Sequence, residues 1–420
     1  MSQELWSKKK ITWLFDVIGS GTTPSASNES YYNSPDKAWL NTGDLTDGYI
    51  EKTSKYVSQI ALEKYSALTV FPKESLVMAM YGATIGKLGI TKYETTTNQA
   101  CCVLAKPKDI LTKFVFYWLM AHRIEIINLS QGGGQPNISQ GIIKNIRIAV
   151  PSIELQNKIV SLVDKKFEEI NHVIKQKEKV MALLKQQIQS IITESVTKGL
   201  NPNVKMKKSG VEWIGEIPEH WKIKKIKHIT QVKRGASPRP IDNPMYFDDD
   251  GEFAWVRIAD VSKSGMYLNK TLQALSELGS SLSVKQYPGD LFVSIAGTVG
   301  KPCITNIKCC IHDGFVYFHD YQYNNKFLYY IFASGQSYKG LGKMGTQLNL
   351  NTDTIGEIKI PWPPVEEQDE IISKLQENIS KIDNLVEIVA NQIEKLKEYR
   401  QSLIYEMVTG KIDVRNIEID

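Results

Sequence analysis

The feature that most constrains this chain is an internal repeat, because two long stretches of the sequence match each other at a nearly fixed offset in residue number. In the later part of each copy this offset is constant at 212, so that Pro151 matches Pro363 and Gln156 matches Gln368. Earlier in each copy the offset drifts to 214 and then to 216. Loops tolerate insertions, whereas a long packed helix does not. The repeat therefore predicts two copies of one module, each a globular domain followed by a long helix.

The constant part of each copy carries apolar residues at alternating spacings of three and four, which is the pattern of a coiled-coil helix. The first seam is Val160, Val163, Phe167, Ile170, Ile174, Met181, Leu184 and Ile188, and the second is Ile372, Leu375, Ile379, Ile382, Val386, Val389, Ile393 and Leu396. Pro151 and Pro363 fit helix starts, and Gly199 and Gly410 fit helix ends. One such seam would also suit an ordinary helical bundle. Two in register, the first net basic and the second net acidic, favour an antiparallel intramolecular coiled coil.

The globular parts alternate short β-like runs with turn residues and helical stretches, which is typical of the α+β class. We therefore expect two pseudo-symmetric mixed α/β domains separated by two long helices. The predicted divisions are residues 1–151 for the first domain, 152–206 for the first long helix, 207–365 for the second domain, and 366–420 for the second long helix with the C-terminal tail.

Composition sets the broad class of protein. Charged residues make up 23% and hydrophobic residues 42%, as in soluble globular proteins. The formal net charge is +5, and both globular segments are mildly basic, which permits a polyanionic partner without demanding one. The longest dense apolar run, residues 114–121, is too short to span a bilayer, and we expect no signal peptide. Five cysteines without disulfide or zinc spacing predict a reducing, cytoplasmic location.

Three motifs resemble parts of enzyme active sites, but each departs from the pattern that its chemistry requires. The segment 82–87 is one residue short of a phosphate-binding loop, and Leu88 replaces the hydroxyl that would hold magnesium. The segment 243–246 resembles the Asn-Pro-Pro-Tyr motif of adenine methyltransferases, but Met245 interrupts it. The Glu-x-Lys at 357–359 has the form of a nuclease motif without the accompanying acidic residue. We therefore predict no catalytic, cofactor-binding or metal-binding residue.

Two groups of polar residues are better candidates for binding DNA. Gln and Asn amides can read adenine, glycines allow close backbone approach, and a lysine on a tight turn can meet a phosphate. The candidates on the turn and the loop that both copies have are Lys87, Gln135, Asn137, Lys301, Lys343, Gln347 and Asn349. The candidates that differ between the copies, and would therefore set sequence preference, are Asn41, Thr42, Arg234, Arg239 and Arg257. All of them would also be ordinary as loop or surface residues.

The order and duplication of several segments resemble the specificity subunit of type I restriction-modification systems. The segment Ser209-Gly-Val-Glu-Trp-Ile-Gly-Glu-Ile-Pro-Glu-His-Trp221 is similar to the start of a target recognition domain in that family. Residues 148–159 and 360–371 resemble the stretches that lead into its long helices. Residues 82–87 and 297–301, which we call the two Gly-Lys turns, resemble its glycine-lysine turn. The resemblance covers essentially the whole chain. The first copy lacks the Trp-Ile-Gly-x-Ile-Pro start, which leaves the edge of that domain open.

The resemblance implies a DNA-recognition subunit that carries out no chemistry. Each target recognition domain would read one half of a bipartite, asymmetric site, and the coiled coil would set the gap between the halves. Two methyltransferase subunits would dock on the chain, and motor-nuclease restriction subunits would join them. S-adenosylmethionine would come with the former, and ATP and magnesium with the latter. The alternatives are a stand-alone DNA-binding or scaffolding protein of the same architecture and a self-contained methyltransferase.

Overall fold

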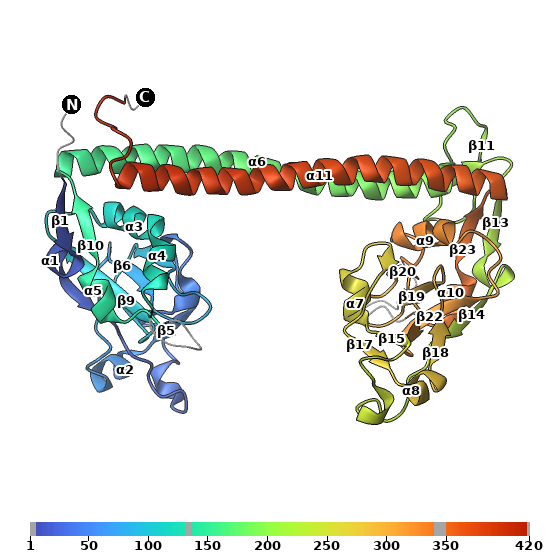
Figure 1. The fold of residues 1–420 in the computed structure, drawn as a ribbon, viewed down its shortest axis with the longest axis horizontal. Coiled ribbons are helices and arrows are strands. Elements are labelled where there is room, and N and C mark those ends of the chain that lie inside the picture. The colour runs from blue at the N-terminus through green and yellow to red at the C-terminus, as the bar shows by residue number, and fades with distance from the viewer. Residues whose placement is uncertain (1–5, 131–136, 340–349, 418–420) are drawn as a thin grey trace. The chain divides into compact units, whose positions relative to one another are not determined.

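The computed structural model describes residues 6–130, 137–339 and 350–417. The chain divides into two compact units, which are Met1–Glu178 with Asn391–Asp420, and Lys179–Ala390. Both divisions fall inside the long helices α6 (Ile153–Lys198) and α11 (Val365–Val408), so each unit contains one globular domain and a part of both helices (Figure 1).

A mixed five-stranded sheet, in the order β2-β9-β6-β7-β4, forms the centre of the first domain. Its strands are β2 (Phe15–Gly19), β9 (Cys101–Pro107), β6 (Leu76–Ala79), β7 (Leu88–Thr91) and β4 (Gly48–Ile50). A second sheet has the order β5-β3-β8, with β5 (Lys55–Val57), β3 (Lys37–Leu40) and β8 (Thr95–Thr97). Strand β6 is buried on both faces, because Leu76 and Met78 join one core cluster and Val77 and Ala79 another.

The second domain repeats this strand order. Its five-stranded sheet is β14-β22-β19-β20-β16, with β14 (Gln231–Arg234), β22 (Phe315–His319), β19 (Leu291–Ser294), β20 (Pro302–Thr305) and β16 (Tyr267–Leu268). The smaller sheet is β17-β15-β21-β18, with β17 (Gln273–Leu275), β15 (Phe253–Val256), β21 (Cys309–Ile311) and β18 (Val284–Gln286). In both domains the last pair of the larger sheet is parallel, namely β4 with β7 and β16 with β20. Matching topology confirms the predicted duplication and the α+β class.

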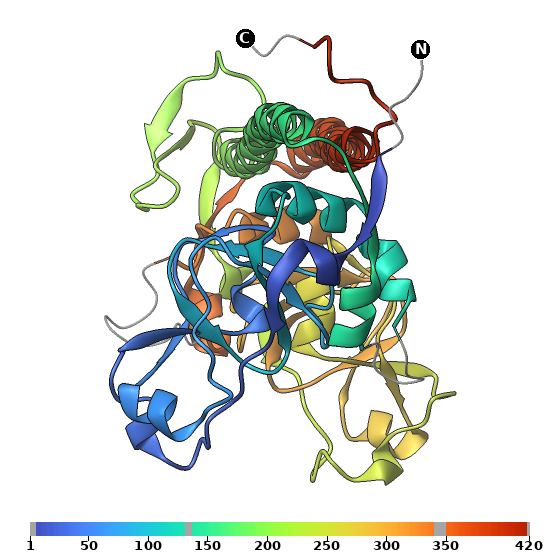
Figure 2. The same ribbon diagram turned by 90° about the vertical axis from the view of Figure 1, so that its left-hand side faces the viewer.

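Short helices surround the sheets. The first domain has α1 (Ile11–Leu14), α2 (Gln59–Lys64), α3 (Thr112–Ala121), α4 (Arg123–Asn128) and α5 (Gln140–Asn145). The second has α7 (Ile258–Lys263), α8 (Glu277–Ser281), α9 (Asn325–Ala333) and α10 (Thr352–Glu357). In the first unit α3 lies directly against the long helices (Figures 1 and 2), where Lys113 Nζ is 2.6 Å from Asp164 Oδ2 and Gln401 Nε2 donates to the Met120 carbonyl at 3.0 Å.

The two long helices pack against each other in opposite directions within each unit. In the first unit the start of α6 shares a core with the end of α11, through residues such as Val163 and Met407. In the second unit the end of α6 shares a core with the start of α11, through Val196 and Ile371. None of the sixteen predicted seam residues is exposed. The predicted antiparallel coiled coil is therefore confirmed.

Polar residues that interrupt the seam have specific partners across the helix pair. Lys177 Nζ donates to Gln392 Oε1 at 2.7 Å. The Arg400 guanidinium donates to Asn171 Oδ1 and lies 4.7 Å from the centre of the Phe167 ring. Polar contacts of this kind select one register, because a shifted pairing would leave the same groups without partners.

A tryptophan at the start of each domain packs on the end of a long helix. A Cβ on Gly199, just beyond α6, would lie 3.0 Å from the Trp221 ring, and one on Gly410, beyond α11, would lie 2.9 Å from the Trp6 ring. Both glycines have positive φ, +74° and +72°, as predicted for helix ends. The strand that follows each tryptophan, β1 (Ser7–Lys10) or β13 (Lys222–Lys225), pairs with the strand that leads into the next long helix, β10 (Arg147–Val150) or β23 (Lys359–Trp362).

This arrangement locates the edge of the first domain. Trp6 and strand β1 occupy the place of Trp221 and strand β13. In the second copy the end of the Trp-Ile-Gly-x-Ile-Pro segment forms β12 (Glu216–Pro218), which pairs with β11 (Met206–Lys208) in a separate hairpin.

Candidate nucleic-acid interface

In each domain a glycine lets the chain after the first strand of the large sheet cross closely over the end of the small sheet. A Cβ on Gly21 would lie 1.8 Å from the Thr97 carbonyl oxygen, and one on Gly235 would lie 2.2 Å from the His312 carbonyl oxygen. No side chain fits at such distances. The two glycines match each other at the offset of 214, so the crossing is a shared feature of the repeat.

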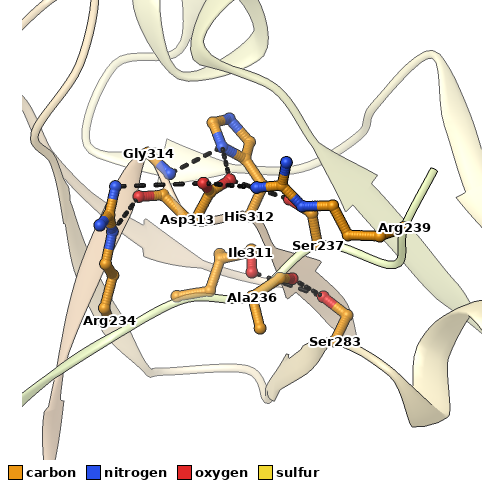
Figure 3. Close-up of polar contacts among 9 residues, drawn as sticks. All are labelled: Arg234, Ala236, Ser237, Arg239, Ser283, Ile311, His312, Asp313 and Gly314. Carbon is orange, nitrogen blue, oxygen red and sulfur yellow. Dashed lines mark hydrogen bonds and ion pairs between the residues drawn. The ribbon is translucent and has the colours of Figure 1, made fainter. Parts of the chain in front are cut away.

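In the second domain the crossing brings two arginines onto one carboxylate (Figure 3). Arg239 Nη2 donates to Asp313 Oδ2 at 3.2 Å. Arg234 Nε donates to the Asp313 backbone carbonyl at 2.5 Å, and its Nη2 lies 4.0 Å from Asp313 Oδ2. Ser237 Oγ donates to Asp313 Oδ1 at 2.9 Å. The two predicted DNA-binding arginines therefore lie together, around an acid that the sequence analysis did not single out.

The pKa of the Asp313 carboxyl is below its ordinary value. Burial acts to raise this pKa, but the hydrogen bonds from Ser237 and from the backbone, with the positive charge of Arg239, outweigh that effect. Asp313 is therefore ionised at neutral pH. Two guanidinium groups and one carboxylate give the cluster a net positive charge. The Arg234 side chain is 59% exposed and the Arg239 side chain is 76% exposed, so this charge lies at the surface.

His312 forms the base of this turn. Its Nδ1 accepts a hydrogen bond from the Gly314 backbone N–H at 2.8 Å, and its ring centre lies 4.7 Å from that of Phe315 and 5.9 Å from that of Trp255. Burial lowers the pKa of His312, against the opposing effect of the Asp313 carboxylate. The ring is therefore a neutral, packed support for the turn that carries Asp313.

The first domain builds the same turn from neutral residues. Thr23 Oγ1 donates to Gln99 Oε1 at 2.6 Å, where the second domain has Ser237 and Asp313 at the offset of 214. Asn98 Oδ1 accepts from the Ala100 backbone N–H at 3.1 Å, where the second domain has His312 and Gly314. The framework of the two turns is thus shared, and the chemistry of the exposed side chains differs.

The predicted pair Asn41 and Arg257 also occupies one equivalent position. The backbone N–H of Asn41 donates to Asp44 Oδ2 at 2.8 Å, and that of Arg257 donates to Asp260 Oδ2 at 2.9 Å. The Asn41 side chain is held by Trp39 and Asn98, and Thr42, beside it, is half-buried. The exposed Arg257 guanidinium donates to Gln273 Oε1. The difference between the copies therefore places a cation in the second domain only.

The two predicted phosphate-binding lysines have different surroundings. Lys301 Nζ donates to the carbonyls of Ser262 and Ser264 at 2.8 and 2.9 Å, at the end of α7, and burial lowers its pKa. Lys87 is exposed, and its ammonium group has no hydrogen bond or ion pair within the described part of the chain. The first domain has only the 3-10 turn Thr42–Asp44 where the second has α7, so the carbonyls that hold Lys301 have no counterpart.

Asn137, the one described residue of the predicted Gln-Asn loop in the first domain, lies beside the start of the Gly-Lys turn. Asn137 is exposed and forms a bridge with Tyr81, and the Ile138 N–H donates to the Met80 carbonyl at 2.8 Å. The other residues predicted in these loops, Gln135, Lys343, Gln347 and Asn349, lie outside the residues that the structure describes.

The Glu-x-Lys segment and the cysteines of the second domain have structural surroundings. Glu357 forms ion pairs with Lys225, at 2.6 Å, and with Lys227. Cys309 and Cys310 point into different core clusters, as adjacent residues of a strand should. No group of three metal-ligating side chains comes together among the described residues.

A family model for the type I restriction modification DNA specificity domain matches residues 3–180 and 218–398. The chain belongs to this family. It is 24% identical over 408 residues to the type I restriction enzyme MjaVIII specificity subunit of Methanocaldococcus jannaschii, covering 93% of this chain and 88% of the relative. It is 22% identical to the EcoDI specificity subunit of Escherichia coli, covering 89% and 86%.

Solved structures of this class share the fold. A chain from a structural study of complex assembly and conformational transition in a type I R-M system superposes with a TM-score of 0.71 at 16% identity, covering 98% of this chain and all of the other. The HsdS subunit of Thermoanaerobacter tengcongensis superposes with a TM-score of 0.50 at 15% identity, covering 97% and 98%.

Family membership confirms the resemblance and the predicted role. The chain is a non-catalytic DNA sequence-recognition subunit of a type I restriction-modification system, with two recognition domains. Among the described residues, no helix is both long and apolar enough to span a bilayer.

Proposed function

We propose that each domain of this specificity subunit reads one half of a bipartite, asymmetric DNA site. The observation that carries this proposal is the pair of equivalent turns at Gln99 and Asp313, which share a framework and differ in exposed chemistry. Two identical readers would select identical halves. Readers that present neutral amides in one domain and arginines in the other select different ones.

We further propose that the helices act as a ruler for the gap between the two halves. Helix α6 has 46 residues and runs without interruption from one unit into the other, a length of about 69 Å at 1.5 Å per residue. A fixed connection turns the second half-site contact into an intramolecular event, so two weak contacts act as one strong contact. DNA turns once in about 10.5 base pairs, so a change in helix length would also move a reader off its groove.

The partners that we propose are two methyltransferase subunits, which bring S-adenosylmethionine, and motor-nuclease restriction subunits, which bring ATP and magnesium, in the cytoplasm. Exposed apolar side chains on the long helices support docking of a protein partner. In the second unit Leu183 on α6 is 54% exposed, and Leu385 and Ile388 on α11 are 48% and 52% exposed. Leu385 and Ile388 are three residues apart and therefore share one face of α11, and grouped apolar side chains on a surface are typical of protein contacts.

The experiment compares the purified chain with the chain purified together with its methyltransferase subunit, on the same set of DNA fragments. We expect sequence-specific binding and methylation by the complex, and no methylation by the chain alone. Methylation by the isolated chain would overturn the proposal. Specific binding that is identical with and without the partner would favour the alternative, a stand-alone DNA-binding protein of the same architecture.

A further inference from the structure

We propose that the second domain reads guanine with Arg234 and Arg239, and that Asp313 is the positioning residue that aims both guanidinium groups. This inference rests on the proposed function and assigns one base class to one half of the site. Its basis is the convergence of the two arginines on one residue in Figure 3, with Arg239 hydrogen-bonded to the Asp313 carboxylate, and Arg234 hydrogen-bonded to the Asp313 backbone carbonyl with its Nη2 4.0 Å from the carboxylate.

The arginines keep free donors for a base. A guanidinium group has five N–H donors in a rigid fork, and guanine offers two acceptors, O6 and N7, at matching spacing in the major groove. Arg234 uses Nε on the Asp313 carbonyl, and Arg239 uses Nη2 on the Asp313 carboxylate. Both side chains are more than half exposed, so donors that make no hydrogen bond to Asp313 remain accessible to a base.

Asp313 is held by the protein framework as well as by the arginines. Ser237 donates to its Oδ1 at 2.9 Å, and the turn is fixed by the hydrogen bond from the Ala236 N–H to the Ile311 carbonyl at 3.1 Å. Ser283 Oγ holds the Ala236 carbonyl at 2.6 Å. A long flexible arginine loses less conformational freedom on binding when such an anchor already fixes its direction.

The first domain supports a reading role over a purely structural one. Where the second domain has Arg234, Arg239 and Asp313, the first has Ser20, Ser25 and Gln99, at the same offset of 214. The carboxylate therefore occurs together with the arginines and is a neutral amide in the domain without them. Exposed ion pairs contribute little to stability. A carboxylate on a DNA-facing surface is also unfavourable beside phosphates unless cations cover it.

The test uses the complex with its methyltransferase subunit on a DNA library that is randomised at both half-sites, followed by sequencing of the methylated molecules. We expect guanine at one or more positions of one half-site. Arg239→Lys keeps the charge but loses the fork, and should lower the preference for guanine there by about fivefold to a hundredfold. Asp313→Asn should lower the preference for guanine at the same positions, and Asp313→Glu, which keeps the carboxylate, should lower it less.

Two variants serve as controls. Glu252→Gln removes another carboxylate of the second domain, which pairs with Lys308 at 2.5 Å, and should change no base preference. Gln99→Ala, in the first domain, should alter the other half-site only. An unchanged preference at the half-site that a variant does not address shows that the complex still assembles and binds DNA.

Three results would overturn the inference. They are a bipartite site without guanine in either half, an Asp313→Asn variant that behaves like Glu252→Gln, and arginine variants that lower methylation of all sequences equally, as loss of a phosphate contact would. Each of these leaves the proposed function standing. A wild-type complex without any sequence preference would overturn the proposed function and the inference together.

Discussion

Replacing the buried glutamine at the start of each long helix should destabilise the two units unequally. Gln156 and Gln368 are equivalent, and both side chains are completely buried. Gln156 Oε1 accepts from the Leu111 N–H at 2.8 Å, and its Nε2 donates to the carbonyls of Pro151 at 3.0 Å and Asp109 at 3.4 Å. Gln368 Nε2 donates only to Pro363 at 3.1 Å, and its buried Oε1 has no partner within the described part of the chain.

The magnitudes follow from the groups that each substitution leaves unpaired. Gln156→Leu leaves the Leu111 N–H and the Pro151 carbonyl without partners, at about 1–3 kcal/mol each, and also removes the longer bond to the Asp109 carbonyl. The apolar side chain offsets part of this cost, so we expect a net loss of about 2–4 kcal/mol. Gln368→Leu strands one carbonyl but also removes an unpaired buried oxygen, for a net loss of about 0–1 kcal/mol. The two substitutions should therefore differ by roughly 2–3 kcal/mol, which corresponds to a factor of about 30 to 150 in the equilibrium constant for local opening of the unit.

Native-state hydrogen exchange, detected by mass spectrometry of peptides, measures the local stability of each unit separately. Peptides from α3 and the start of α6 should lose protection in Gln156→Leu, while peptides from α9 and the start of α11 should change little in Gln368→Leu. In the second unit the segment before α9 is tied to α11 by another contact, because Asn324 Nδ2 donates to Asp369 Oδ1 at 2.8 Å, which does not involve Gln368. Equal losses, or a larger loss in Gln368→Leu, would refute the reasoning.

Three further predictions concern other parts of the chain. All five cysteines are buried, and burial raises the pKa of Cys102 to about 12, so that at pH 8 only about one Cys102 thiol in 10⁴ is ionised. The cysteines of the native chain should therefore resist alkylation by iodoacetamide. Rapid modification of all five thiols would contradict the fold. Lys301→Met should destabilise the second unit by about 1 kcal/mol in urea unfolding, because it uncaps α7. Lys87→Met should change the free energy of unfolding by less than about 0.5 kcal/mol, but should reduce the dependence of DNA affinity on salt concentration by the amount expected for about one lost phosphate contact. Equal effects of the two lysine substitutions on stability and on DNA binding would contradict these different roles. Gly235→Ala should destabilise the second unit by about 1–3 kcal/mol, and a neutral result would exclude the close crossing.

The long helices could be predicted from the sequence because their side chains meet at fixed spacings along one element. Apolar residues such as Ile170 and Ile393 lie three or four positions from the next apolar residue on either side, and the same spacing recurs in the other copy at the offset of 212. The edge of the first domain could not be predicted in the same way. Trp6 matches Trp221 at an offset of 215, but no flanking motif accompanies it, and its role depends on contact with a helix end near the other terminus of the chain.

The candidate site was predicted in part. Arg234 and Arg239 could be selected because they differ from the first copy, but Asp313 could not, since its importance depends on the chain crossing at Gly235. One signal was present, because Gln99 matches Asp313 at the offset of 214. The lysines of the two Gly-Lys turns matched in sequence but differ in surroundings, because a helix in one domain replaces a short turn in the other.

The central claim is that two different readers are joined by a ruler of fixed length. Lys177 on α6 contacts Gln392 on α11 in the first unit, so Val180 and Val389, each three residues further along the antiparallel pair, are opposite points in the second unit. Inserting four residues after each, about one helical turn, lengthens both helices together. Sequencing of DNA methylated by the complex should then give the same two half-sites with a changed gap between them. An unchanged gap with full methylation would contradict the account.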